Sequence, residues 1–112
     1  MRITGLKGED LAVNYLKKKG YRILEKNYRT PIGEIDIIAE QKGTVVFVEV
    51  KTRTTDAFGL PEEAVTRQKQ ERIKKVALLY LKGLKRVPPV RFDVLSIELK
   101  PEPVIEHIEY AF

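Results

Sequence analysis

Residues 33–53, GEIDIIAEQKGTVVFVEVKTR, constrain the fold more than any other stretch, because two strand-like runs are joined there by a short polar break. Residues 45–48 are β-branched and aromatic, which is typical of a central strand. The break over residues 40–44 places Gly43 at the tip of a tight turn. The stretch therefore predicts an antiparallel hairpin in the interior of a sheet.

Three charged residues lie where a buried hairpin should carry none: Asp36, Glu49 and Lys51. Because side chains alternate between the two faces of a strand, Glu49 and Lys51 are expected to point the same way. On the preceding strand, Asp36 shares its face with Glu34 and Ile38. The hairpin brings Asp36 roughly level with Glu49, so two carboxylates and a lysine are expected to meet at one edge of an apolar sheet.

Such a cluster needs a physical reason, because adjacent carboxylates repel each other unless a proton or a cation lies between them. Asp36 and Glu49 supply hard oxygen ligands of the kind that Mg²⁺ or Mn²⁺ takes, with water and phosphate completing the shell. Lys51 can position or help to deprotonate a water and can stabilise negative charge on a phosphate. The alternative is structural: an ion pair between Glu49 and Lys51 at a strand end, with Asp36 in a local hydrogen bond.

Length and composition narrow the class of protein. The 112 residues suffice for one modest core, so we expect a single domain over residues 1–112. The absence of cysteine excludes disulfides, thiol catalysis and Cys-based zinc sites. No apolar stretch approaches the roughly 20 residues that span a bilayer, and the N-terminus lacks a signal-peptide core, so we expect a cytoplasmic protein without a membrane partner. The net charge of +5 suits a polyanionic partner, although ribosomal, membrane-surface and ordinary soluble proteins also reach it.

A first helix is expected over residues 5–19, with Gly20 at the position that favours a left-handed residue after a helix. At helical spacing its apolar stripe consists of Leu6, Ala12, Val13 and Leu16. Glu9 falls close to the middle of that stripe. One interpretation sends Glu9 past its neighbours to solvent or to a basic partner; the other makes it a further carboxylate aimed at Asp36 and Glu49.

The other expected elements are a strand over residues 21–29, a polar loop over residues 52–60, a helix from Pro61 to about Lys82, a strand over residues 90–99 and a weaker edge strand over residues 104–110. The order α-β-β-β-α-β-(β) predicts a mixed sheet flanked by helices. On the second helix, Lys69 lies nearer the apolar stripe than the other basic residues and can point toward the sheet. Arg91 and Asp93 share a face of their strand and can pair.

These residues carry a resemblance. Asp36 followed by Glu49-Val50-Lys51 resembles the PD-(D/E)-x-K nuclease signature, with Ile35 in place of the usual proline, and the helical Glu9 is similar to a glutamate of archaeal Holliday-junction resolvases. Nearly the whole chain resembles the YraN family of predicted endonucleases. The shared pattern is Asn27-Tyr28-Arg29, Gly33-Glu34-Ile35-Asp36, Phe47 to Lys51 with Arg53, Phe58-Gly59, Lys69 and Arg91-Phe92-Asp93-Val94.

The resemblance implies a restriction-endonuclease-like α/β fold and a metal-dependent endonuclease that acts on nucleic-acid phosphodiester bonds, with branched DNA as an expected substrate. In that hypothesis Asp36, Glu49 and the backbone carbonyl of Val50 hold Mg²⁺ or Mn²⁺. Glu9 binds a second metal ion or a water on the first. Lys51 orients the water that displaces the 3′ oxygen in line.

Further roles follow from the same resemblance. Arg29, Arg53 and Lys69 are candidates for contacts to backbone phosphates, which would give salt-sensitive binding with little sequence preference. A homodimer is expected by analogy with the two-fold symmetry of a DNA junction. No histidine base is required, so His107 is interpreted as structural or solvent-facing. The competing hypotheses are a nucleic-acid-binding module that keeps the nuclease fold without cutting, and a ribosome- or RNA-associated protein whose acidic cluster is structural.

Overall fold

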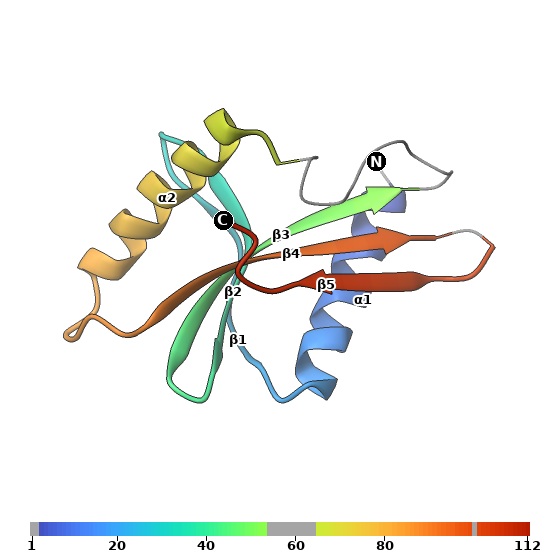
Figure 1. The fold of residues 1–112 in the computed structure, drawn as a ribbon, viewed down its shortest axis with the longest axis horizontal. Helices are drawn as coiled ribbons and strands as arrows, with labels where there is room; N and C mark the ends of the chain where they lie inside the picture. The colour runs from blue at the N-terminus through green and yellow to red at the C-terminus, as the bar shows by residue number, and fades with distance from the viewer. Residues whose placement is uncertain (1–2, 54–64, 100) are drawn as a thin grey trace.

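In a computed structural model, which describes residues 3–53, 65–99 and 101–112, with the side chains of the first helix from Gly8 onward, the chain forms helices packed on a five-stranded sheet (Figure 1). The elements are, in chain order, α1 (Ile3–Lys18), β1 (Arg22–Arg29), β2 (Glu34–Gln41), β3 (Thr44–Arg53), α2 (Arg67–Lys82), β4 (Val90–Glu98) and β5 (Val104–Ile108). The expected order α-β-β-β-α-β-(β) is confirmed.

The sheet is mixed, with the strand order β1-β2-β3-β4-β5. Strands β3 and β4 are parallel, whereas the other neighbouring pairs are antiparallel. Helix α2 lies on the crossover that a parallel pair requires, and α1 and α2 cover opposite faces of the sheet (Figure 1). Strand β5 lies at an edge, as expected. Within the described residues, neither helix is long and apolar enough to cross a membrane.

The central hairpin joins β2 and β3 through Lys42 and Gly43, which have φ values of 50° and 85°. Two successive residues with positive φ are the signature of the two-residue turns that match the twist of a hairpin. The turn is therefore shorter than the predicted break over residues 40–44, and its tip is at Gly43 as expected. The antiparallel register runs from Gln41 opposite Thr44 to Ile37 opposite Val48.

Each face of the sheet has its own apolar core. Under α1, the cluster is built from Ala12, Leu16, Tyr21, Ile37, Ala39, Val46, Val48, Leu95 and Ile97. Under α2, it is built from Ile35, Ile38, Val45, Phe47, Val65, Ile73, Val76, Ala77 and Val94. The alternation of β3 residues between the two clusters follows directly from the period of two in a strand. Side chains of β3 are therefore buried on both faces, which explains its continuous apolar run.

Gly8 allows α1 to approach the end of β3 closely. A Cβ atom built at Gly8 would collide with the side-chain oxygen of Thr52. The residue after Gly8 is Glu9, so this close approach fixes the height at which Glu9 faces the sheet.

Several boundaries differ from the sequence-based expectation: the strands expected over residues 21–29, 90–99 and 104–110 cover Arg22–Arg29, Val90–Glu98 and Val104–Ile108. The first helix covers Ile3–Lys18 rather than residues 5–19, and Gly20 follows it with a φ of 90°, as expected. Helix α2 begins at Arg67, because the Thr66 side chain accepts a hydrogen bond from the backbone of Lys69 and caps the helix. The predicted start at Pro61 lies outside the described residues, as do residues 54–60 of the predicted loop. Strand β3 continues through Arg53, which belongs to the sheet rather than to a loop.

A buried polar network ties β4 to its surroundings on the α1 face. Asp93 is fully buried and accepts two hydrogen bonds of 2.9 Å from Arg91, which confirms their predicted pairing. His107 Nε2 lies 2.7 Å from Asp93 Oδ2, and His107 Nδ1 lies 3.2 Å from the hydroxyl of Tyr15 on α1. The backbone N–H of Tyr110 donates to Asp93 as well. Of the two interpretations of His107, the structure supports the structural one.

The Asp93 carboxylate holds this network together. Burial alone would raise the pKa of Asp93, but the hydrogen bonds with His107 and Arg91 outweigh it and hold the pKa below its ordinary value. The ionised form is therefore the one that the folded state favours. Removing this side chain would leave the Arg91 guanidinium buried without its main partner.

We expect Asp93→Ala to lower the free energy of unfolding by about 3–5 kcal/mol, because an uncompensated buried charge remains. Urea unfolding at pH 7 measures the change. The matched control is Asp10→Ala, which removes an exposed carboxylate of α1 and is expected to stay within about 0.5 kcal/mol of wild type. Equal stability of the two variants would contradict the structural role of the network.

Candidate metal and catalytic site

The candidate site begins where β2 and β3 separate. Asp36 and Glu49 are the next two residues beyond the last paired positions, Ile37 and Val48. Here the side chain of Asp36, and not its backbone, links the two strands, because its Oδ2 accepts a hydrogen bond of 2.8 Å from the backbone N–H of Val50. The side chain of Asp36 therefore spans from β2 to β3 and lies level with Glu49, as the hairpin predicts.

Strand β2 is irregular at Asp36. Ile35 and Ile38 both pack into the core under α2, although a regular strand would place residues three apart on opposite faces. On the neighbouring strand β1, Asn27 has a φ of 51° and lies between the residues that pair with Ile35 and Ile37. The two strands therefore depart from regular geometry at the same level, which is the level of the acidic pair.

Glu9 reaches this level from α1. Its Oε2 accepts a hydrogen bond of 3.2 Å from the side-chain amide of Asn27, the β1 residue across from Asp36. This partner is an uncharged amide, which neither interpretation of Glu9 had named. Within the described part of the chain, no group of three Asp, Glu or His side chains is close enough to hold one ion. Glu9 therefore lies beside the acidic pair without joining it in a single cluster.

Glu49 forms an ion pair with a lysine of α2, the helix on the other face of the sheet from α1. Lys69 Nζ of α2 lies 2.8 Å from Glu49 Oε2, and the exposed fractions of the two side chains are 38% and 5%. The cap at Thr66 fixes the first turn of α2, and Lys69 belongs to that turn. The prediction that Lys69 points toward the sheet is confirmed. Sequence reasoning did not find its partner, because the pair depends on how α2 crosses the sheet.

Lys51 completes a group of four charges that we call the quartet: Asp36, Glu49, Lys51 and Lys69. Lys51 follows Glu49 by two residues on the same strand and is half-buried. Burial lowers the pKa of Lys51, and the neighbouring Lys69 lowers it further. Lys51 thus lies beside Lys69 rather than in a simple pair with Glu49, and its amine loses a proton more readily than an exposed lysine.

The electrostatics of the two remaining members differ. Burial raises the pKa of Asp36 to about 7, and repulsion by Glu49 adds to the rise, while the Val50 N–H and Lys69 oppose it. For Lys69, burial lowers the pKa, but the hydrogen bonds with Glu49 and Lys51 outweigh that effect and the net direction is upward. In the quartet the pKa of a carboxyl group and the pKa of an amine are both shifted from their ordinary values, which is typical of functional sites.

The chemistry of the donor set fits a hard divalent cation. Asp36 and Glu49 are adjacent carboxylates, and their repulsion is the kind that a cation between them removes. The chain supplies two carboxylates here, so the other ligands would come from a backbone carbonyl such as that of Val50, from water or from substrate oxygens.

The remaining predicted residues, Arg29 and Arg53, have partners outside the quartet. Arg29 is exposed and pairs with Glu34 at 3.2 Å, and both line a hollow of about 250 Å³ together with Thr30 and Gly33 at the β1–β2 turn. Arg53 is half-buried at the end of β3, opposite Glu98 of β4. Among the described residues, neither arginine forms a hydrogen bond or an ion pair with a member of the quartet.

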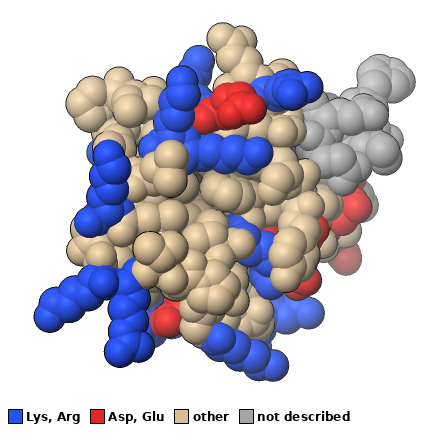
Figure 2. Space-filling view, turned by 60° about the vertical axis from the view of Figure 1, so that its left-hand side comes forward, with Lys and Arg blue, Asp and Glu red and all other residues tan. Residues whose placement is uncertain are grey.

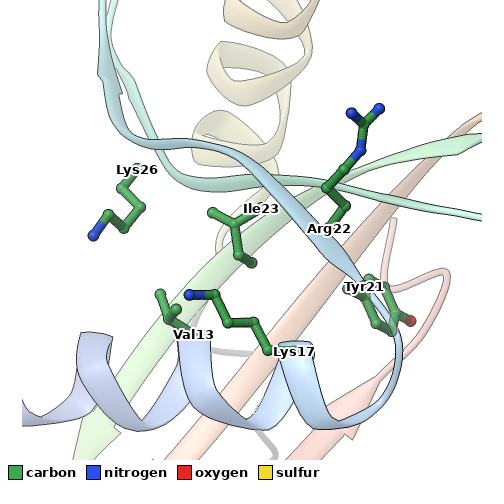
Figure 3. Close-up of a pocket in the computed structure, with 6 residues that line it drawn as sticks. All are labelled: Val13, Lys17, Tyr21, Arg22, Ile23 and Lys26. Atoms are coloured by element: carbon green, nitrogen blue, oxygen red, sulfur yellow. The ribbon is translucent and has the colours of Figure 1, made fainter.

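A second hollow was not found by sequence reasoning. It has a volume of about 560 Å³, lies between α1 and β1, and is lined by Val13, Lys17, Tyr21, Arg22, Ile23 and Lys26 (Figure 3). Lys17 and Lys26 flank the gap from the two elements, whereas Arg22 pairs with Glu40 of β2. The signal in the sequence is the alternation of basic and apolar residues at the end of α1 and the start of β1.

Basic side chains are also frequent on the side of the molecule that lies to the left in Figure 1. Figure 2 shows a face on which Lys and Arg side chains are scattered around an uncharged centre, with few acidic side chains among them. This distribution agrees with the net charge of +5. It does not single out one basic surface as a binding face.

Comparisons with known proteins give the family. The model of the uncharacterised protein family UPF0102 matches residues 8–97. A UPF0102 protein of Thermodesulfovibrio yellowstonii is 56% identical over 96% of this chain and 94% of its own length. A UPF0102 protein of Syntrophomonas wolfei is 51% identical over 99% of this chain and 98% of its own length.

Among solved structures, the chain is similar to Pyrococcus furiosus SfsA in complex with Ca²⁺. The similarity covers 96% of this chain and 63% of that one, with a TM-score of 0.38 and 15% sequence identity.

The raised pKa of Asp36 predicts a pH-dependent stability. A carboxyl group whose pKa rises from 3.8 to about 7 on folding binds its proton more tightly in the folded state. Its contribution is fully present below about pH 4 and is lost as the pH rises through about 7. We expect Asp36→Asn to be more stable than wild type by about 4 kcal/mol at pH 8 and nearly equal at pH 4, because the amide stays neutral at both.

Urea unfolding at pH 4, 6 and 8 measures this difference. The control is Glu34→Gln, an exposed carboxylate of the same strand, which is expected to show no such trend. A gain for Asp36→Asn that is independent of pH, or a loss of stability at pH 8, would contradict the assigned electrostatics.

Proposed function

The chain belongs to the family UPF0102, the YraN family of the resemblance, and we propose that it is a metal-dependent endonuclease that hydrolyses phosphodiester bonds in nucleic acid. Branched DNA is the expected substrate, by the same resemblance, and a homodimer is expected on a two-fold symmetric junction. The observation that carries the proposal is the quartet, in which the buried carboxylate of Glu49, the half-buried carboxylate of Asp36 and two amines meet where β2 and β3 separate.

The chemistry of the candidate ligands supports a metal ion in this proposal. Asp36, Glu49 and the carbonyl of Val50 would hold Mg²⁺ or Mn²⁺. Glu9, which accepts a hydrogen bond from Asn27 on the strand next to Asp36, would act through a water on that ion rather than as a direct ligand. When bound, the cation would neutralise charge on the scissile phosphate.

The residues of the chain would carry the proton and position the nucleophile. Lys51, whose pKa is lowered by burial and then by Lys69, is able to accept a hydrogen bond or a proton from the attacking water more readily than an ordinary lysine. The water oxygen forms a bond to phosphorus while the bond between phosphorus and the 3′ oxygen breaks. The leaving 3′ oxygen takes up a proton, which solvent can supply.

A second candidate function is a nucleic-acid-binding module that does not cut. The observation that favours it is the ion pair between Lys69 and Glu49, because it balances the buried carboxylate without a metal ion. Cleavage is what separates the two candidates.

The first test measures cleavage of four-way junction, flap, single-stranded and duplex DNA, and of RNA, in Mg²⁺ or Mn²⁺. We expect Asp36→Asn, Glu49→Gln and Lys51→Met each to lower the cleavage rate by about 100-fold or more, because each removes a group that acts on the reacting phosphate. Affinity for the same nucleic acid is expected to stay within about threefold, since binding is dominated by other phosphate contacts.

The control for charge is Asp10→Asn, an exposed carboxylate of α1 that is expected to cleave like wild type. Binding without cleavage on every substrate and with either metal would favour the second candidate. Wild-type cleavage by all three quartet variants would show that the quartet is structural.

A separate prediction concerns the surface that binds phosphate. If nucleic acid crosses the hollow between α1 and β1, the double variant Lys17→Glu/Lys26→Glu is expected to weaken binding about tenfold or more and to reduce its salt dependence. The matched control, Lys74→Glu/Lys75→Glu, makes the same change in net charge on exposed residues of α2. Equal losses in both double variants would indicate an effect of net charge alone.

A further inference from the structure

When all four of its groups are ionised, the quartet has no net charge. Asp36 and Glu49 contribute two negative charges, and Lys51 and Lys69 contribute two positive ones. The closest pair is Lys69 Nζ and Glu49 Oε2, at 2.8 Å. A divalent cation that entered this site without any rearrangement would add two positive charges next to two ammonium groups, which like-charge repulsion opposes.

We propose that Lys69 is an internal counterion that a divalent cation must displace from Glu49 in order to bind. The inference rests on the metal site of the proposed function and goes beyond it by assigning Lys69 to the regulation of that site. It makes Lys69 a positioning residue, which acts through Glu49, and it departs from the prediction that Lys69 is simply a phosphate contact.

The burial of the two partners supports displacement of the lysine rather than of the carboxylate. The Glu49 side chain is 5% exposed and belongs to the central strand β3, so it has little freedom to leave. The Lys69 side chain is 38% exposed at the start of α2 and carries a flexible four-carbon stem. Its ammonium can therefore swing toward solvent while the Thr66 cap keeps the helix backbone in place.

The position of Lys69 also explains how the site exists without a metal ion. Removing the partner of a buried carboxylate is costly, so a site designed only for a cation would be strained when the cation is absent. In this chain the ammonium fills that role through a hydrogen bond of normal length to Glu49. Competition between the ammonium and the cation for the same oxygen should therefore weaken metal binding.

The experiment measures Mn²⁺ binding by the full-length chain with isothermal titration calorimetry at pH 8. We expect Lys69→Met to bind Mn²⁺ about tenfold more tightly than wild type, because the competing ammonium is absent. Lys69→Arg keeps a cation in place and is expected to bind like wild type. Lys74→Met is the matched control, since it removes one positive charge from an exposed position of the same helix and is expected to change the affinity less than twofold.

Thermal unfolding supplies a second readout that is independent of the calorimetric titration. Without metal, Lys69→Met is expected to have a lower Tm than wild type, because Glu49 has lost its partner, and Mn²⁺ is expected to raise the Tm of this variant more than that of wild type. If Lys69→Met does not fold without metal, Lys69→Gln takes its place, because a glutamine can still donate a hydrogen bond to Glu49 without carrying charge.

The outcomes separate the two proposals. Two results would overturn the counterion role and leave the metal site standing. In the first, wild type binds Mn²⁺ and Lys69→Met binds it with equal or weaker affinity. In the second, Lys74→Met gains as much affinity for Mn²⁺ as Lys69→Met does. Binding by Lys69→Met alone would support displacement in its strongest form. If neither wild type nor the Lys69 variants bind Mn²⁺, the metal site itself is wrong and the counterion role falls with it.

Discussion

The structure depends on one electrostatic constraint: a carboxylate, Glu49, is buried in the central strand of the sheet beside a second carboxylate, Asp36. Burial of one charge is unfavourable unless it is paired, and two like charges side by side make it more so. The chain meets the constraint with a lysine from α2 and with a backbone N–H freed by the separation of β2 and β3.

Two aspartates of this protein, the buried Asp93 and the half-buried Asp36, show how the partners of a carboxylate determine its role. On the α1 face, Asp93 accepts hydrogen bonds from Arg91 and Tyr110, lies 2.7 Å from His107, and has its pKa held low. Such a carboxylate is stable in its ionised form and has little capacity left for a ligand. On the α2 side, Asp36 has its pKa raised toward neutrality, so its ionised form is strained and a cation would relieve it. Residues of one chemical type therefore serve stability in one place and are available for chemistry in the other.

The parts of the fold that the sequence predicted are those with local causes. The hairpin follows from alternating side chains and a glycine turn, so the level of Asp36 with Glu49 and the common face of Glu49 and Lys51 could be derived from spacing alone. The pairing of Arg91 with Asp93 follows from the same period of two. The start of α2 could not be derived in this way, because Pro61 and Thr66 are both good starting residues and only the folded chain shows which one caps the helix.

The contacts that the sequence did not predict are those between elements far apart in the chain. The partner of Lys69 depends on the crossing of α2 over the sheet, the bond from Asn27 to Glu9 depends on the height of α1, and the place of His107 depends on the register of β5. None of these is set by the propensity of a single residue. The hollow between α1 and β1 was missed for the same reason, since its basic residues become neighbours only when the two elements pack.

Anomalous diffraction from crystals grown with Mn²⁺ would show whether Asp36 and Glu49 together form a cation site. We expect a strong anomalous peak about 2.0–2.3 Å from an oxygen of each carboxylate, with Lys69 Nζ moved away from Glu49. The contradicting result is a structure at saturating Mn²⁺ in which the peak is absent from both carboxylates and the ion pair between Lys69 and Glu49 is unchanged.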